Sequence, residues 1–159
     1  MISTVEKVLF LKGVDLFKSI PSEELSHIAQ ITDEVEFATD EEVFAEGDQG
    51  DAMYLIVDGS VKVHSGEHVF AELGIRQCFG EMAILDAEPR SASITSLSEL
   101  TLLKIRREDF AEILAEKPEI SQGIIHVLTH LLRLPKKLLT SSYCFAIGSC
   151  GLNPPPATW

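Results

Sequence analysis

The sequence predicts an α+β fold that is mainly β, in which a β-sandwich or jelly-roll β-barrel is flanked by N-terminal helices and by two C-terminal helices. Two observations carry this prediction. Short β-like runs separated by turn residues fill the chain from residue 34 to about 105, and apolar residues recur at helical spacing before and after that region. A length of 159 residues is enough for one full domain.

Two short helices are expected before the β region. In the segment 23–31 the apolar residues recur at the spacing of an amphipathic helix, at Leu25, Ile28 and Ala29. Ser22 is the predicted N-cap of this helix, and the two glutamates that follow it suit the positive end of the helix dipole. The apolar segment 8–16 predicts another short helix.

The strands of the middle region are predicted from short apolar runs. Residues 53–57 are apolar on both faces, which is typical of a strand covered on both sides. Asp58-Gly59 follows, and an Asp-Gly pair between two β runs predicts a hairpin that joins this run to the one at Val61 and Val63. The other predicted strands contain Val35 and Phe37 or span residues 68–73, 92–97 and 100–105. Many short strands at this spacing are typical of a β-sandwich or a jelly-roll barrel.

Two more helices are expected after the β region. The first has apolar residues at Phe110, Ile113 and Leu114, and Pro118 interrupts it. The second ends before Leu134, and its apolar stripe consists of Ile120, Ile124, Val127, Leu128 and Leu131. We therefore assign residues 1–133 to one domain and leave the tail 134–159 unassigned.

Charge and composition exclude several classes of function. Lys and Arg total 13 against 25 Asp and Glu, a net charge of −12 that argues against binding nucleic acid or an anionic membrane through bulk charge. No stretch approaches the roughly 20 apolar residues of a membrane-spanning helix, and the first residues do not resemble a signal peptide. The three cysteines are too few for a disulfide framework. We expect a soluble protein of the reducing cytoplasm that inserts into no membrane and contacts no nucleic acid.

Metal centres and catalytic motifs are not predicted. His126 and His130 are four residues apart on an expected helix, but the residues between them supply no general base. Cys144 and Cys150 have no second pair and no histidine nearby. We therefore expect no metal, no cofactor and no enzymatic activity.

The segment 79–94 interrupts the β pattern and has the residues of an anion site. Gly80 allows a ligand to approach the backbone closely, and a short helix start after it offers unpaired N–H groups to an anion. Arg90 adds a planar two-pronged donor and Ser91 a hydroxyl. Glu81 is an acceptor when ionised and suits a sugar hydroxyl. A phosphate and a hydroxyl recognised together indicate a nucleotide with its ribose.

This segment resembles the phosphate-binding cassette of the cyclic nucleotide-binding domain family, which is approximately F-G-E-x-A-x-L, a short spacer and P-R-[ST/A]-A. The matching positions are Gly80, Glu81, Ala83, Arg90, Ser91 and Ala92. The resemblance extends over roughly residues 8–133 and includes Glu46-Gly47-Asp48 and Met53-Tyr54-Leu55-Ile56. It implies a jelly-roll β-barrel that senses a cyclic nucleotide.

The resemblance also implies a role for each cassette residue. Glu81 would bind the ribose 2′-hydroxyl, Arg90 would pair with the cyclic phosphate, and backbone N–H groups around Ala83 together with Ser91 would complete the cradle. The full predicted ligand-binding set is Gly80, Glu81, Met82, Ala83, Arg90, Ser91 and Ala92. One four-residue stretch departs from the family pattern, because Gly74-Ile75-Arg76-Gln77 stands where a Gly-Pro-Gly-Asp-like turn is frequent. Cys78, just after it, is expected to be a small buried strand residue.

The expected ligand is cAMP in preference to cGMP, because family members that prefer cGMP often have Thr at the position of Ser91. The expected signal is closure of the last helix over the base as a lid, with Ile124, Leu128 and Leu131 as its covering residues. For this, the nucleotide must bind the closed arrangement more tightly than the open one. An effector domain or protein in the parent chain would receive the signal.

Three other functions fit parts of the sequence. A degenerate jelly roll that has lost nucleotide binding would act as an interaction module. A DNA-binding regulator would share the sensory domain, but the 26 residues from Leu134 onward are too few for a helix-turn-helix, so the chain would be a fragment. A cupin-like metal site would need clustered histidines, and only His64 and His68 lie in the β region.

Overall fold

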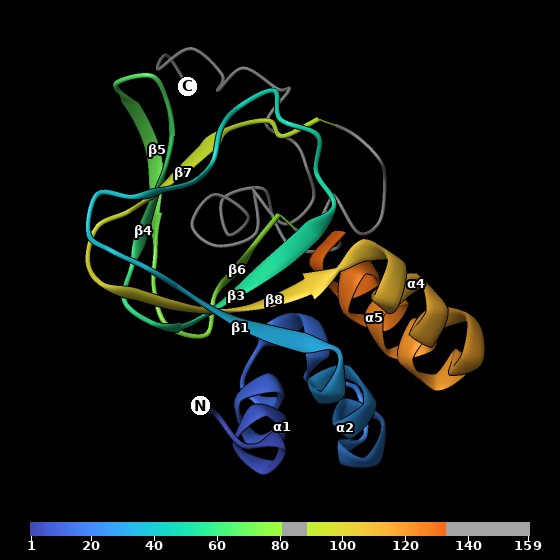
Figure 1. Cartoon of the computed structure of the whole chain (residues 1–159). Helices are drawn as coiled ribbons and strands as arrows, with labels where there is room; N and C mark the ends of the chain where they lie inside the picture. Colours follow the sequence, from blue (N-terminus) through green and yellow to red (C-terminus); the bar gives the residue numbers. More distant parts are fainter. Residues whose placement is uncertain (81–88, 133–159) are drawn as a thin grey trace.

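The computed structural model describes residues 1–80 and 89–132, apart from four side chains near the end of the last helix. Within these residues the chain forms eight strands in two four-stranded sheets, with helices before and after them (Figure 1). All strand pairs within the two sheets are antiparallel. The predicted mainly-β fold with helices at both ends is confirmed.

The two sheets are built from alternating parts of the chain. One has the order β1-β8-β3-β6, with strands β1 (Thr32–Phe37), β8 (Leu100–Arg106), β3 (Ala52–Asp58) and β6 (Cys78–Phe79). The other has the order β2-β7-β4-β5, with strands β2 (Glu42–Phe44), β7 (Ser93–Ser96), β4 (Val61–Ser65) and β5 (His68–Leu73). Because β3 pairs with β6, the start of β3 lies beside the residue that follows β6.

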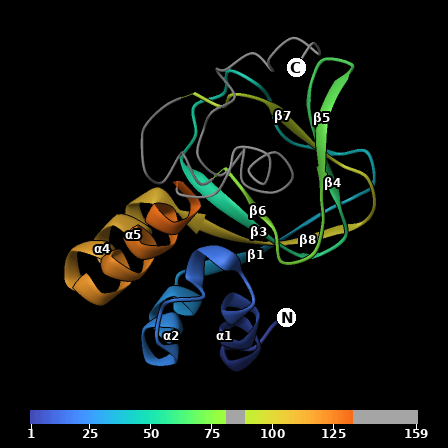
Figure 2. The same cartoon turned by 180° about the vertical axis from the view of Figure 1, so that it is seen from behind.

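The helices of the described residues gather at one end of the two sheets, beside β1 and the end of β8 (Figures 1 and 2). They are α1 (Thr4–Lys12), the 3-10 helix η1 (Asp15–Phe17), α2 (Ser22–Gln30), α4 (Arg107–Glu116) and α5 (Pro118–Leu132). α4 ends at Glu116 and α5 begins at Pro118, so the helical pattern is interrupted at this proline, as predicted. Among residues 1–80 and 89–132, no helix has the length and apolar character needed to cross a membrane.

Two apolar cores stabilise this arrangement. The first joins the helices to one face of the β3-containing sheet through Met53, Leu55, Leu103 and Ile105. The second lies between the sheets and includes Tyr54, Ile56, Phe79, Ile94 and Leu102. Successive side chains of a strand point to opposite faces, so β3 contributes to both cores. The prediction that residues 53–57 are covered on both sides is confirmed.

The predicted hairpin at Asp58-Gly59 is wrong. β3 and β4 belong to different sheets, and β4 instead forms its hairpin with β5 around Gly66. Gly59 has a φ of 91°, and a Cβ there would be only 2.3 Å from the carbonyl oxygen of Glu99. This glycine therefore lets the chain pass close to the segment before β8 as it crosses from one sheet to the other.

The N-terminal helices differ from prediction at their ends. The predicted helix over 8–16 is two elements, because α1 ends at Lys12 with Gly13 as its C-cap and η1 follows. Ser22 is not the N-cap of α2, since the helix begins at Ser22 itself and Pro21 occupies the cap position. Pro21 fits there because its fixed φ is already close to −60° and the position needs no N–H donor.

Candidate functional site

Arg90 is held between the ends of two neighbouring strands. Only 8% of Arg90 is exposed, and its Nη2 donates to the carbonyl oxygen of Ala52 at 2.7 Å. Its Nη1 donates to the carbonyl oxygen of Gly80 at 3.2 Å. Ala52 begins β3 and Gly80 follows β6, so the pairing of these strands brings the two carbonyls together. Hydrogen bonds in two directions fix the plane of the guanidinium group.

The backbone of Arg90 is fixed by the loop after β2. Gly47 donates its N–H to the carbonyl oxygen of Arg90 at 2.8 Å, and Arg90 donates its own N–H to the carbonyl oxygen of Asp48 at 2.8 Å. Gln49 and Pro89 form an isolated antiparallel bridge beside these bonds. The Glu46-Gly47-Asp48 motif, which the resemblance to the family includes, belongs to this loop. Its structural role is to pair with the chain at residues 89–90.

Position 80 requires glycine because the backbone there lies close to the side chain of Arg90. Its φ is 76°, a conformation that residues with a side chain rarely adopt. A Cβ on Gly80 would be 2.6 Å from Nη1 of Arg90 and 3.2 Å from the carbonyl oxygen of Ala52. The structure therefore brings the predicted site residues Gly80 and Arg90 into direct contact and leaves no room for a larger residue at position 80.

One aromatic ring lies over the guanidinium group of Arg90, and two further rings pack against that ring. The Cζ atom of Arg90 is 4.0 Å from the centroid of the Phe44 ring. Tyr54 and Phe79 stack with their centroids 5.3 Å apart, and Phe44 contacts both of them. Burial raises the pKa of the Tyr54 hydroxyl, and the charge of Arg90 offsets part of that rise. Sequence reasoning missed Phe44, because nothing local in the sequence connects residue 44 to residue 90.

Of the remaining predicted cassette residues, Ser91 and Ala92 belong to the described part of the structure. Ser91 is exposed, whereas Ala92 is buried in the core between the sheets. Ser93, which was not predicted, accepts a hydrogen bond at its Oγ from the N–H of Glu46 at 2.9 Å and so holds the loop after β2. The predicted residues Glu81, Met82 and Ala83 lie outside the described residues.

The predicted lid residues lie on α5. Ile124 is 4% exposed and belongs to the core that α5 shares with the N-terminal helices. At Gly123, a Cβ would come within 2.9 Å of the Cγ1 atom of Ile20, so α5 packs closely against the chain after η1. The side chains of Leu128 and Leu131 lie outside the described part of the structure.

The turn before β6, where the sequence departs from the family pattern, contains a residue with a positive φ. Arg76 has a φ of 68°, and its N–H donates to the carbonyl oxygen of Ile56 at 2.9 Å. The side chain of Gln77 accepts from the N–H of Gly74 at 2.7 Å and closes the turn. Cys78, expected to be buried, is half-buried and lies in β6, where it pairs with Leu55.

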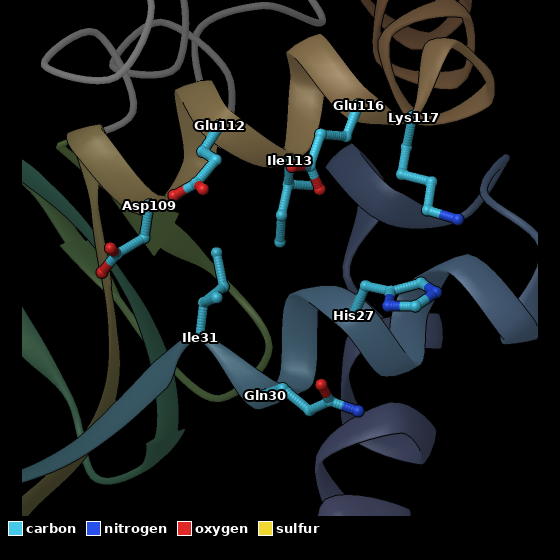
Figure 3. Close-up of a pocket in the computed structure, with 8 residues that line it drawn as sticks. All are labelled: His27, Gln30, Ile31, Asp109, Glu112, Ile113, Glu116 and Lys117. Atoms are coloured by element: carbon cyan, nitrogen blue, oxygen red, sulfur yellow. The ribbon is translucent and has the colours of Figure 1, made fainter.

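A separate cavity of about 220 Å³ lies between α2 and α4 (Figure 3). Its lining residues are His27, Gln30, Ile31, Asp109, Glu112, Ile113, Glu116 and Lys117. None of them belongs to the predicted ligand-binding set. Within residues 1–80 and 89–132, no cluster of three or more His, Cys, Asp or Glu side chains is placed to hold a metal ion.

Comparison with known proteins identifies the family of this chain. The family model described as the cyclic nucleotide-binding domain matches residues 34–117, which contain Phe44, Gly80 and Arg90. The chain belongs to the cyclic nucleotide-binding domain family. A mainly-β jelly roll with flanking helices is the fold of its relatives of known structure.

One similar curated protein is a transcriptional regulator. The chain is 29% identical over 134 residues to a CRP-like cAMP-activated global transcriptional regulator of Mycobacterium tuberculosis, covering 81% of this chain and 59% of that protein. The chain thus spans about three fifths of the length of that regulator.

Two solved structures are similar across most of the chain. The N-terminal domain of a transcriptional regulator from Streptomyces coelicolor A3(2) has a TM-score of 0.72 and 29% identity, covering 84% of this chain and 97% of that one. The regulatory domain of Toxoplasma gondii PKA, solved with cAMP, has a TM-score of 0.65 and 27% identity, covering 69% of this chain and 44% of that one.

Proposed function

We propose that this chain is the receptor domain of a signalling protein and binds cAMP in preference to cGMP. The observation that carries the proposal is the burial and fixed orientation of the Arg90 guanidinium group. Its guanidinium group is largely buried, is oriented by the carbonyls of Ala52 and Gly80, and lies next to a glycine that admits no side chain. A pre-oriented arginine in a site of low exposure binds a phosphate through charge-assisted hydrogen bonds that water weakens little.

The proposed contacts extend from Arg90 along the cassette. Arg90 pairs with the cyclic phosphate, and Ser91, which is exposed beside it, donates to the same group. Glu81 accepts from the ribose 2′-hydroxyl, with Met82 and Ala83 at the backbone cradle. Support for cAMP comes from Ser91 at the position where cGMP-preferring members often have Thr, and from the relatives named for cAMP.

The proposed signal is a movement of α5 over the nucleotide. Ile124 is buried against the N-terminal helices, so such a movement has to exchange its present contacts for contacts with the ligand. The nucleotide shifts this equilibrium only through its higher affinity for the closed arrangement. Hydrogen exchange tests this step: added cAMP is expected to change amide protection in residues 118–132, and unchanged protection there would refute the lid.

Calorimetric titration of the full chain with cAMP and with cGMP tests the proposal. We expect micromolar or tighter binding, with cAMP the stronger ligand. Arg90→Lys keeps the charge but loses the two-pronged geometry, so affinity should fall about tenfold or more. Arg106→Lys is the matched control, because Arg106 is exposed and pairs only with Asp33, at 3.5 Å, among the described ion pairs.

The outcomes separate a receptor from an interaction module. Binding that Arg90→Lys weakens and Arg106→Lys leaves unchanged supports the proposal. Thermal unfolding of each variant shows whether the loss of affinity is a loss of fold, since Arg90 also satisfies two backbone carbonyls. A wild-type chain that is folded and binds neither nucleotide would refute the proposal and indicate a degenerate module.

A further inference from the structure

Phe44 contacts the guanidinium group of Arg90 through the face of its ring. The distance of 4.0 Å runs from the ring centroid to Cζ, the central atom of the guanidinium group, so the cation lies over the ring and not beside its edge. Phe44 is the last residue of β2 and is half-buried. Such a contact is attractive because the face of an aromatic ring is electron-rich, and it strengthens as water is excluded.

Phe44 is itself held by two further rings. Its centroid is 6.0 Å from that of Tyr54 and 5.8 Å from that of Phe79. Tyr54 and Phe79 stack at 5.3 Å with planes 17° apart. These two rings belong to β3 and β6, the same strands whose ends present the carbonyls that accept from Arg90. The ring contacts of Phe44 and the hydrogen bonds of Arg90 therefore both depend on the pairing of β3 with β6.

We propose that Phe44 is the positioning residue of Arg90, and that its ring orients the guanidinium group for an anionic ligand. A carboxylate in the place of Phe44 would also attract Arg90, but it would occupy N–H donors and cancel the charge that an anion needs. A ring does neither, because it contacts the face of the guanidinium group while the N–H donors lie in the plane. The inference rests on the proposed function of Arg90.

A purely structural role for Phe44 predicts a different result. Phe44 packs against the core between the sheets, so its truncation costs stability whatever it does for Arg90. Phe37 provides the matched control, because it packs against the same core from β1. Among the described residues, the cation–π contact to Arg90 is made by Phe44 and not by Phe37.

The experiment compares Phe44→Leu, Phe44→Tyr and Phe37→Leu in the full chain, with cAMP affinity and thermal unfolding midpoint measured for each. Phe44→Leu should lower cAMP affinity about tenfold, the effect of losing a partly desolvated cation–π contact. Phe44→Tyr keeps the ring face and should restore affinity to within about twofold of wild type. Phe37→Leu should lower the midpoint without changing affinity. Equal losses of affinity in Phe44→Leu and Phe37→Leu would overturn the inference.

A double-mutant cycle tests the contact without any nucleotide. The variants are Phe44→Leu, Arg90→Met and the pair together, because methionine removes the cation that lysine would keep, and non-additive unfolding midpoints show that the two side chains interact. Intact cAMP binding by Phe44→Leu with additive midpoints would overturn the inference and leave the proposed function standing. A wild-type chain that binds neither cyclic nucleotide, yet has coupled midpoints, would refute the proposed function and show that the ring and the guanidinium group still interact.

Discussion

The side chain of Arg76 lies against Gly13, so closely that a Cβ on Gly13 would be 3.1 Å from the Cδ and Nε atoms of Arg76. Gly13 is the C-cap of α1, and Arg76 belongs to the turn between β5 and β6. The contact therefore joins the helical end of the molecule to the turn that leads through β6 to Gly80. It is made by a residue with strained backbone, since the φ of Arg76 is 68°.

Replacing Arg76 separates the backbone strain from the side-chain contact. Arg76→Ala and Arg76→Gly both remove the contact with Gly13, but only Gly adopts a φ of 68° without steric cost. We expect Arg76→Gly to be more stable than Arg76→Ala by about 1 kcal/mol. Urea unfolding measures the difference, and an Ala variant at least as stable as the Gly variant would contradict the strain.

The capping box at the start of α1 predicts a dependence on pH. Glu6 accepts hydrogen bonds from the N–H and the hydroxyl of Ser3, and these bonds lower the pKa of its carboxyl group. A lowered pKa means that the folded state favours the ionised form. This contribution is present at neutral pH and is lost as the pH falls through the pKa of the folded state. In a pH titration by NMR, Ser3→Ala should move the pKa of Glu6 upward. An unchanged pKa would show that the Ser3 hydroxyl does not lower it.

The sequence predicted the features of this fold that are local in the chain. Gly80 and Arg90 belong to one short motif, and the break between α4 and α5 follows from a single proline at 118. The hairpin at Asp58-Gly59 failed because a turn signal specifies a reversal of direction but not which strand the chain joins. Phe44 was missed for a related reason, since its contact with Arg90 depends on how two sheets pack and leaves no local pattern.

The packing of α5 on the N-terminal helices depends on Gly123. A Cβ there would be 2.9 Å from Cγ1 of Ile20, which is buried. Alanine favours a helix by up to about 1 kcal/mol over glycine, but the collision should outweigh this gain and loosen α5. We expect Gly123→Ala to lower stability and to speed amide exchange in α5. Adding Ile20→Ala should restore slow exchange in part, and a stabilised single variant would contradict the close packing.

Substitutions at two glycines with positive φ can separate the effect of backbone strain from the effect of displacing Arg90. Gly80 and Gly66 have φ values of 76° and 58°, so alanine is strained at both positions. A Cβ on Gly66 meets nothing within 4 Å, whereas a Cβ on Gly80 lies 2.6 Å from Nη1 of Arg90.

Gly66→Ala should cost about 1 kcal/mol of stability and leave cAMP affinity unchanged. Gly80→Ala should cost a similar strain and also lower affinity about tenfold or more, because it displaces the guanidinium group that would pair with the phosphate. Calorimetry measures the cAMP affinity of both variants, and urea unfolding measures their stability. If the two substitutions lowered affinity equally, backbone strain, and not the contact with Arg90, would explain the glycine at position 80.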